Sequence, residues 1–153
     1  IVSQSGFTPQ KFDEEKKLDV PGLKVFHIQE IDFRSHNLLF KDALLELKNW
    51  SIANSGHLPI IITMNAKDSG SPQARKPLPF NAQALSNIDK EIRDIFGEDQ
   101  LITPDLVRGN YKNLEDAILS EGWPLLDKVR GRFLFVLDEG EGKKKHIYPF
   151  FQI

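Results

Sequence analysis

The stretch HLPIIITMNAKD, residues 57–68, decides the fold class. Ile60, Ile61 and Ile62 follow one another directly, so an extended chain here would be apolar on both of its faces. Such a run is typical of a strand that is buried inside a parallel sheet. We therefore predict a buried parallel strand that ends close to Asn65.

Amphipathic helices are predicted on both sides of this strand, over residues 36–56 and 81–97. In each segment the apolar residues recur at the spacing of one helical face, and a glycine follows as a stop signal. The residues of the two apolar faces are Phe40, Ala43, Leu44, Leu47 and Trp50 in the first helix and Leu85, Ile88, Ile92, Ile95 and Phe96 in the second.

The remaining segments continue the alternation of strands and helices. Residues 23–28, 101–104 and 131–138 are predicted as strands, and residues 113–124 as a short helix. Strict alternation indicates an α/β fold with a parallel sheet and crossover helices.

Two architectures fit, an open doubly wound sheet and part of a TIM-type (β/α)8 barrel. The glycine-rich nucleotide motifs of open sheets are absent, and the 153 residues are roughly half of the ~250 that a full barrel needs, which favours a partial barrel.

Composition excludes several classes of protein. The chain is 40% hydrophobic and 27% charged, which is sufficient for a packed core. The net charge of −2 provides no general positive field, so we expect no nucleic-acid partner. The absence of cysteine excludes disulfides and thiolate chemistry. No apolar run is long enough to span a bilayer, and a chain that begins with Ile1 rather than Met is typical of a processed or partial product.

Polar residues gather where the predicted parallel strands end. With side chains alternating along each strand, His27, Asn65 and Asp138 take the last inward positions, and Lys67 and Asp68 follow just beyond. Chemistry in parallel α/β folds collects at the carboxyl ends of strands. A histidine, an amide oxygen and carboxylates there suit a hard cation and a phosphate ester.

Structural explanations of the same residues stay open from spacing alone. A single histidine on an apolar strand is more often structural than catalytic, and Asn65 fits an Asx-turn that closes its strand. Lys67 and Asp68 also fit a solvated turn.

Three stretches resemble the calcium-dependent phosphoinositide phospholipase C family of the bacterial and fungal type. They are PGLKVFHIQEIDFRS, WSIANSGHLPIIITMNAKD and LITPDLVRGNYKNLEDAILSEGWPLLDKVRGRFLFVLDEGE, and the resemblance runs from about Phe12 to Glu141. It implies a TIM-type barrel of the phospholipase C kind, Ca²⁺ as cofactor and an inositol phospholipid at a membrane surface as partner. It also implies a secreted or periplasmic protein.

The resemblance implies a role for each candidate residue. His27 matches the family's second catalytic histidine, which ends the third strand and hydrogen-bonds the phosphoryl oxygen. Asn65 ends the fourth strand, at the position of a calcium ligand that is Glu in animal relatives. Asp138 falls near the end of the sixth strand, where animal enzymes carry lysines that bind ring phosphates, so we expect a headgroup with few phosphates. Lys67 and Asp138 are assigned to substrate binding.

The resemblance further implies that the chain is the middle portion of the catalytic barrel. Residues 1–23 match the loop before the third strand, and residues 24–153 match the central β/α units. The family's first histidine and its Glu-x-Asp metal pair have no counterpart in the sequence, so we expect the isolated chain to be inactive. Two alternatives stay open, a glycerophosphodiester phosphodiesterase-like enzyme and a catalytically silent barrel that binds lipid or protein.

Overall fold

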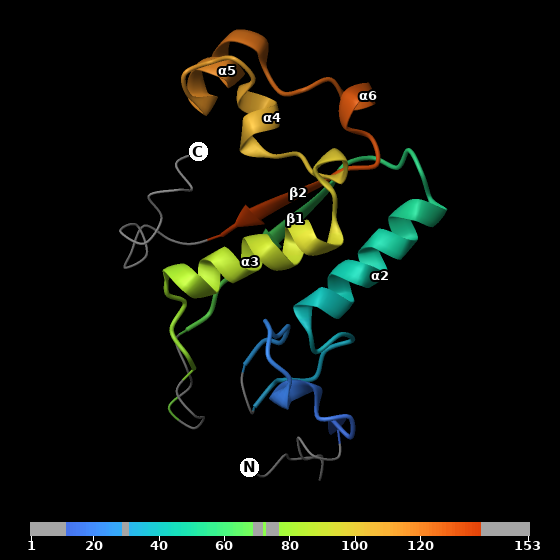
Figure 1. The fold of residues 1–153 in the computed structure, drawn as a ribbon, viewed down its shortest axis with the longest axis vertical. Helices are drawn as coiled ribbons and strands as arrows, with labels where there is room; N and C mark the ends of the chain where they lie inside the picture. Colours follow the sequence, from blue (N-terminus) through green and yellow to red (C-terminus); the bar gives the residue numbers. More distant parts are fainter. Residues whose placement is uncertain (1–11, 29–30, 69–71, 73–76, 139–153) are drawn as a thin grey trace. The chain divides into compact units, whose positions relative to one another are not determined.

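The computed structural model describes residues 12–28, 31–68, 72 and 77–138 (Figure 1). The chain divides into two compact units, which are described separately. The first unit comprises residues 1–47 and 67–95, and the second comprises residues 48–66 and 96–153.

The first unit contains the short 3-10 helix η1 (Lys17–Asp19), most of helix α2 (Phe40–Ala53) and helix α3 (Ala82–Ile95). Both long helices were predicted, and the apolar face of α3 is buried as expected, at Leu85, Ile88 and Ile92. The predicted face of α2 is only partly buried, because Leu44 is 1% exposed but Trp50 is 47% exposed.

Glu91 of α3 fixes the chain just before residue 24. Its Oε1 atom accepts a hydrogen bond from the backbone N–H of Leu23 at 3.1 Å. Gly22 precedes this contact with a φ of +122°, and a Cβ atom there would lie 3.3 Å from the same oxygen. Glycine suits this position on both counts, since only glycine adopts that φ readily and leaves room for the carboxylate.

The predicted strand over residues 23–28 is wrong in the described structure. Only isolated antiparallel bridges form there, Lys24 with Leu39 and Ile28 with Asp32. Strand structure requires a continuous partner for the backbone N–H and C=O groups. Here Val25 and Phe40 donate instead to carbonyls of the segment facing them, Leu38 and Leu23 respectively, which gives a short local pairing rather than a ladder.

The second unit contains a two-stranded parallel sheet, β1 (Ile60–Met64) and β2 (Phe133–Leu137). The strands lie side by side in Figure 1, with Ile60 opposite Phe133 and Met64 opposite Leu137. Both strands and their parallel direction were predicted, which confirms an α/β fold with parallel strands. A partial barrel stays a prediction.

After α3, a series of short helices leads to β2. They are the 3-10 helix η2 (Glu98–Gln100), α4 (Pro104–Arg108), α5 (Leu114–Glu121) and α6 (Leu126–Val129). The predicted helix near residues 113–124 is confirmed as α5, which begins where the Asn113 side chain accepts a hydrogen bond from the Asp116 N–H. Thr103 caps α4 in the same way, and this helix was not predicted.

The predicted strand over residues 101–104 is also wrong. Leu101 makes a single parallel bridge to Phe133, because Pro104 starts α4 immediately afterwards. Since Phe133 also pairs with Ile60, Leu101 lies on the other edge of β2. In the part of the chain that is described, β1 and β2 pair directly and no strand lies between them in the sheet, so the sixth place that the resemblance gave to β2 is wrong as well.

The core of the second unit is aromatic. Phe133 and Phe96 are 0% and 1% exposed, and their ring centroids are 4.5 Å apart. Phe135 lies on the same face of β2, 5.8 Å from Phe96. Phe133 and Phe135 therefore form the face of β2 that packs against Phe96.

Candidate functional site

Asn65 and Asp138 meet where β1 and β2 end. The Nδ2 atom of Asn65 donates a hydrogen bond to the backbone oxygen of Asp138 at 3.1 Å. The N–H of Asp138 in turn donates to the backbone oxygen of Met64 at 2.7 Å. Both side chains are exposed. The structure therefore brings these two predicted residues together at the carboxyl edge of the parallel sheet.

One face of β1 is open in the described structure. Exposure alternates along the strand, with Ile61 and Thr63 exposed and Ile60, Ile62 and Met64 partly covered. Ile61 is 64% exposed, which is high for a large apolar side chain in a sheet. The prediction that this strand is buried on both faces is therefore wrong for the described residues, because only the parallel pairing with β2 is formed. Asn65 follows Thr63 by two residues and continues this open face.

His27 and Lys67 meet in the first unit. His27 lies in a bend, and its side chain is 62% exposed. Its Nδ1 atom lies 2.9 Å from Oδ2 of Asp32, and its backbone oxygen accepts a hydrogen bond from Nζ of Lys67 at 3.5 Å. The structure thus groups four of the five candidate residues as two pairs, His27 with Lys67 in the first unit and Asn65 with Asp138 in the second.

Asp32 contacts His27 in the structure, and the sequence did not predict this contact. Asp32 follows His27 by five residues, a spacing that matches neither a strand face nor a helix face. A tight turn between the two residues would have been the signal, and polar residues after Ile28 agree with one.

A second histidine, His57, has a structural position. Its Nδ1 donates to the backbone oxygen of Leu58 at 2.6 Å, so Nε2 accepts the hydrogen bond from the hydroxyl of Ser51 at 2.8 Å. Ser51 is only 5% exposed, and the His57 ring lies 5.6 Å from that of Phe133. This pair links the end of α2 to the aromatic core, and the burial of Ser51 excludes it as a nucleophile for a bulky substrate.

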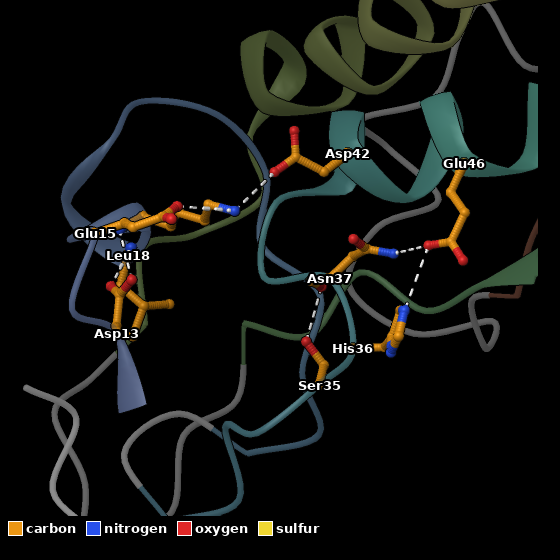
Figure 2. A network of polar contacts seen from close by, with 9 residues as sticks. Asp13, Glu15, Leu18, Ser35, His36, Asn37, Asp42 and Glu46 are labelled. Atoms are coloured by element: carbon orange, nitrogen blue, oxygen red, sulfur yellow. Dashed lines mark hydrogen bonds and ion pairs between the residues drawn. The ribbon is translucent and has the colours of Figure 1, made fainter. Parts of the chain in front are cut away.

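Figure 2 shows a polar network around the start of α2, within the first unit. Glu46 accepts a hydrogen bond from Nδ2 of Asn37 at 2.6 Å and lies 3.7 Å from Nε2 of His36. Nζ of Lys17 lies 3.2 Å from a carboxylate oxygen of Glu15 and 3.9 Å from one of Asp42. The hydrogen bond that Lys17 donates to Glu15 raises the pKa of the lysine.

The buried Asp13 in this network accepts hydrogen bonds from two backbone N–H groups of η1, Lys17 and Leu18. Contacts to Asp42 and Glu46 join neighbouring segments to α2, and those of Asp13 fix η1, so this network stabilises local structure.

The described residues do not form a calcium site by themselves. Ca²⁺ takes six to eight oxygen ligands, usually with several carboxylates. No group of three or more His, Cys, Asp or Glu side chains with metal-binding geometry exists in the part of the chain that is described. Asn65 provides one neutral oxygen, which is not enough to hold the ion.

Comparisons with known proteins give the family. The model of the family described as "Phosphoinositide phospholipase C, Ca2+-dependent" matches residues 1–150. No curated protein matches the chain at a significant level. Across residues 12–28, 31–68, 72 and 77–138, no helix has the length and apolar character needed to cross a membrane.

Solved structures of related enzymes are also similar. A Ca²⁺-dependent phosphatidylinositol-specific phospholipase C from Streptomyces antibioticus is 26% identical, with a TM-score of 0.57 over 84% of this chain. A calcium-dependent phosphoinositol-specific phospholipase C from the Gram-negative bacterium Pseudomonas sp. is 23% identical over 71% of this chain, with a TM-score of 0.48.

The chain spans 38% of the length of the Streptomyces structure and 36% of the Pseudomonas structure. The family match covers nearly all of its residues, and it agrees with the resemblance seen in the sequence. The chain belongs to the Ca²⁺-dependent phosphoinositide phospholipase C family.

Proposed function

We propose that the protein containing this chain is a calcium-dependent phosphodiesterase that cleaves phosphatidylinositol-type lipids to diacylglycerol and an inositol phosphate, by way of a cyclic ester. The observation that carries the proposal is the family match over residues 1–150. This chain contributes part of the site, because its described residues lack the carboxylate cluster of a calcium centre.

In the proposed reaction the inositol 2-hydroxyl attacks the phosphorus in line. A bond forms between that oxygen and phosphorus, and the bond to the diacylglycerol oxygen breaks. The hydroxyl loses its proton, and the departing oxygen gains one. His27 forms a hydrogen bond to a phosphoryl oxygen and stabilises the charge that develops there. The exposed position of its ring supports this role, since a lipid headgroup must reach it.

Asn65, Lys67 and Asp138 complete the proposed contribution of this chain. Asn65 contributes its amide oxygen to a calcium ion whose other ligands come from outside the described residues. Lys67 and Asp138 line the headgroup site, and an acidic side chain at 138 favours phosphatidylinositol over polyphosphorylated lipids. The meeting of Asn65 and Asp138 at one strand edge supports this arrangement.

We also propose that the parallel strands belong to a TIM-type barrel. Residues 1–23 would form the loop before the third strand, and residues 24–153 the central β/α units. The exposed apolar side chain of Ile61 supports this, because that face of the sheet would point into a barrel packed with side chains. The substrate would be met at a membrane surface, and by family habit the protein would be secreted or periplasmic.

Phosphorus NMR of phosphatidylinositol vesicles treated with the whole protein tests the proposed function. The expected result is a cyclic inositol phosphate signal that grows with calcium and stops when a chelator is added. Hydrolysis that continues in the chelator would contradict the proposal. Tight vesicle binding without hydrolysis would also contradict it, and would favour a silent lipid-binding protein.

The isolated 153-residue chain gives a second test. We expect it not to turn over the lipid, because one histidine and one neutral oxygen supply neither a general base nor a complete calcium site. Robust calcium-dependent turnover by this chain alone would refute the proposal that it contributes only part of the active site.

A further inference from the structure

The carboxylate of Asp32 lies against the ring of His27, and no part of the proposed function uses it. The distance between Oδ2 of Asp32 and Nδ1 of His27 is 2.9 Å, which is that of a charge-assisted hydrogen bond. The side chains are 62% and 57% exposed. Exposed pairs of this kind contribute little to stability, so the contact has a larger effect on the orientation of the ring than on the fold.

The backbone holds Asp32 in place. Ile28 and Asp32 form an antiparallel bridge in which each N–H donates to the other's carbonyl oxygen at 2.9 Å. This reciprocal pair fixes Asp32 opposite the residue that directly follows His27. The hydrogen bond from Lys67 to the backbone oxygen of His27 adds a further contact on the histidine itself.

The chemistry of the pair determines where the imidazole exchanges a proton. An ionised carboxylate only accepts hydrogen bonds, so Nδ1 of His27 carries the hydrogen that points to Asp32. This is true of both the neutral and the charged ring. Nε2 is therefore the atom that changes, accepting a hydrogen bond in the neutral form and donating one in the charged form.

We infer that Asp32 is a positioning residue that fixes the Nδ1–H tautomer of His27 and directs Nε2 to the phosphoryl group. This inference rests on the proposed function for the role of His27. Asp32 itself does not touch the substrate.

Kinetics of the whole protein, with calcium and phosphatidylinositol vesicles, provide the first readout. We expect Asp32→Ala to lower kcat about 10- to 100-fold with little change in KM, by analogy with the carboxylate partners of metal-bound histidines. Asp32→Glu should recover part of the loss, because it restores a carboxylate. Glu46→Gln is the matched control. It removes the carboxylate 3.7 Å from exposed His36 and should leave turnover unchanged.

The tautomer itself provides a second readout that does not depend on turnover. With ¹⁵N-labelled histidine at alkaline pH, two-bond couplings identify which ring nitrogen carries the hydrogen, and His27→Gln assigns the signal. The wild-type protein should show His27 as Nδ1–H, and Asp32→Ala should show a mixture or the Nε2–H form. A merely structural role for Asp32 would not change this pattern.

The outcomes separate the inference from the proposed function. If the wild-type protein is active and Asp32→Ala matches it in kcat and tautomer, the inference is overturned and the proposed function stands. A changed tautomer with unchanged kcat also overturns the inference. If the wild-type and Glu46→Gln proteins are both inactive with calcium, the proposed function is overturned. The positioning role of Asp32 in catalysis is then overturned as well, because it rests on that function.

Discussion

Replacing Phe133 by alanine should remove a large part of the stability of the second unit. Phe133 is 0% exposed, and its ring lies 4.5 Å from Phe96, 5.6 Å from His57 and 6.4 Å from Phe135. Truncating a buried phenylalanine to alanine costs about 3–5 kcal/mol, because the transfer free energy is lost and a cavity remains. The cost should lie in the upper part of this range, since the site is enclosed by rings that cannot collapse easily.

Urea unfolding followed by circular dichroism measures this cost. With a slope of about 2 kcal/mol per molar urea, a cost of about 4–5 kcal/mol should lower the midpoint by roughly 2–2.5 M. Leu119→Ala is the control, because Leu119 is 78% exposed and surface substitutions usually stay within about 0.5 kcal/mol. A midpoint for Phe133→Ala equal to that of the control would refute the aromatic core as described.

Three further perturbations follow from local contacts. Ser51→Ala leaves Nε2 of His57 without its donor, and should cost about 1–3 kcal/mol in the same unfolding assay; a smaller effect would mean that water replaces the hydroxyl. Asn113→Ala removes the cap of α5 and should cost about 1 kcal/mol, whereas Asn113→Ser should restore most of it. The hydrogen bond to Glu121 raises the pKa of Tyr111, so its contribution to stability is present at neutral pH and is lost as the pH rises through the raised pKa. Glu121→Gln should lower the pH at which the phenolate absorbance of Tyr111 appears, and an unchanged titration would contradict this.

Features determined by local sequence were predicted well. The 3.6-residue period of residues 81–97 placed α3, and the buried side chains of Leu85, Ile88 and Ile92 lie on the predicted face. The isoleucine run of β1 likewise predicted a parallel strand. Both patterns are set by the residues of one segment, so they can be read without knowledge of its partners.

Features that depend on a partner strand were predicted poorly. Residues 23–28 have the branched and aromatic composition of a strand, but composition does not provide the neighbour whose N–H and C=O groups complete a ladder. In the structure Lys24 bridges Leu39 instead. The strand predicted over residues 101–104 does not form for a different reason, since Pro104 begins helix α4 three residues after Leu101.

The spatial arrangement of the candidate residues was predicted in part. Asn65 and Asp138 lie close together as expected, because each follows a strand of the same parallel pair and parallel strands end at the same edge of a sheet. Asp32 was missed because its contact with His27 depends on a tight turn and not on strand alternation.

The most direct test of the central claim is the rate of phosphatidylinositol cleavage by the whole protein with calcium, compared between wild type and His27→Ala. The account predicts that the variant folds as wild type does, since His27 lies in an exposed bend. Its kcat should fall by about 10²–10³, the scale of removing one hydrogen-bond donor from a developing oxyanion. An unchanged kcat would remove His27 from the site and contradict the account.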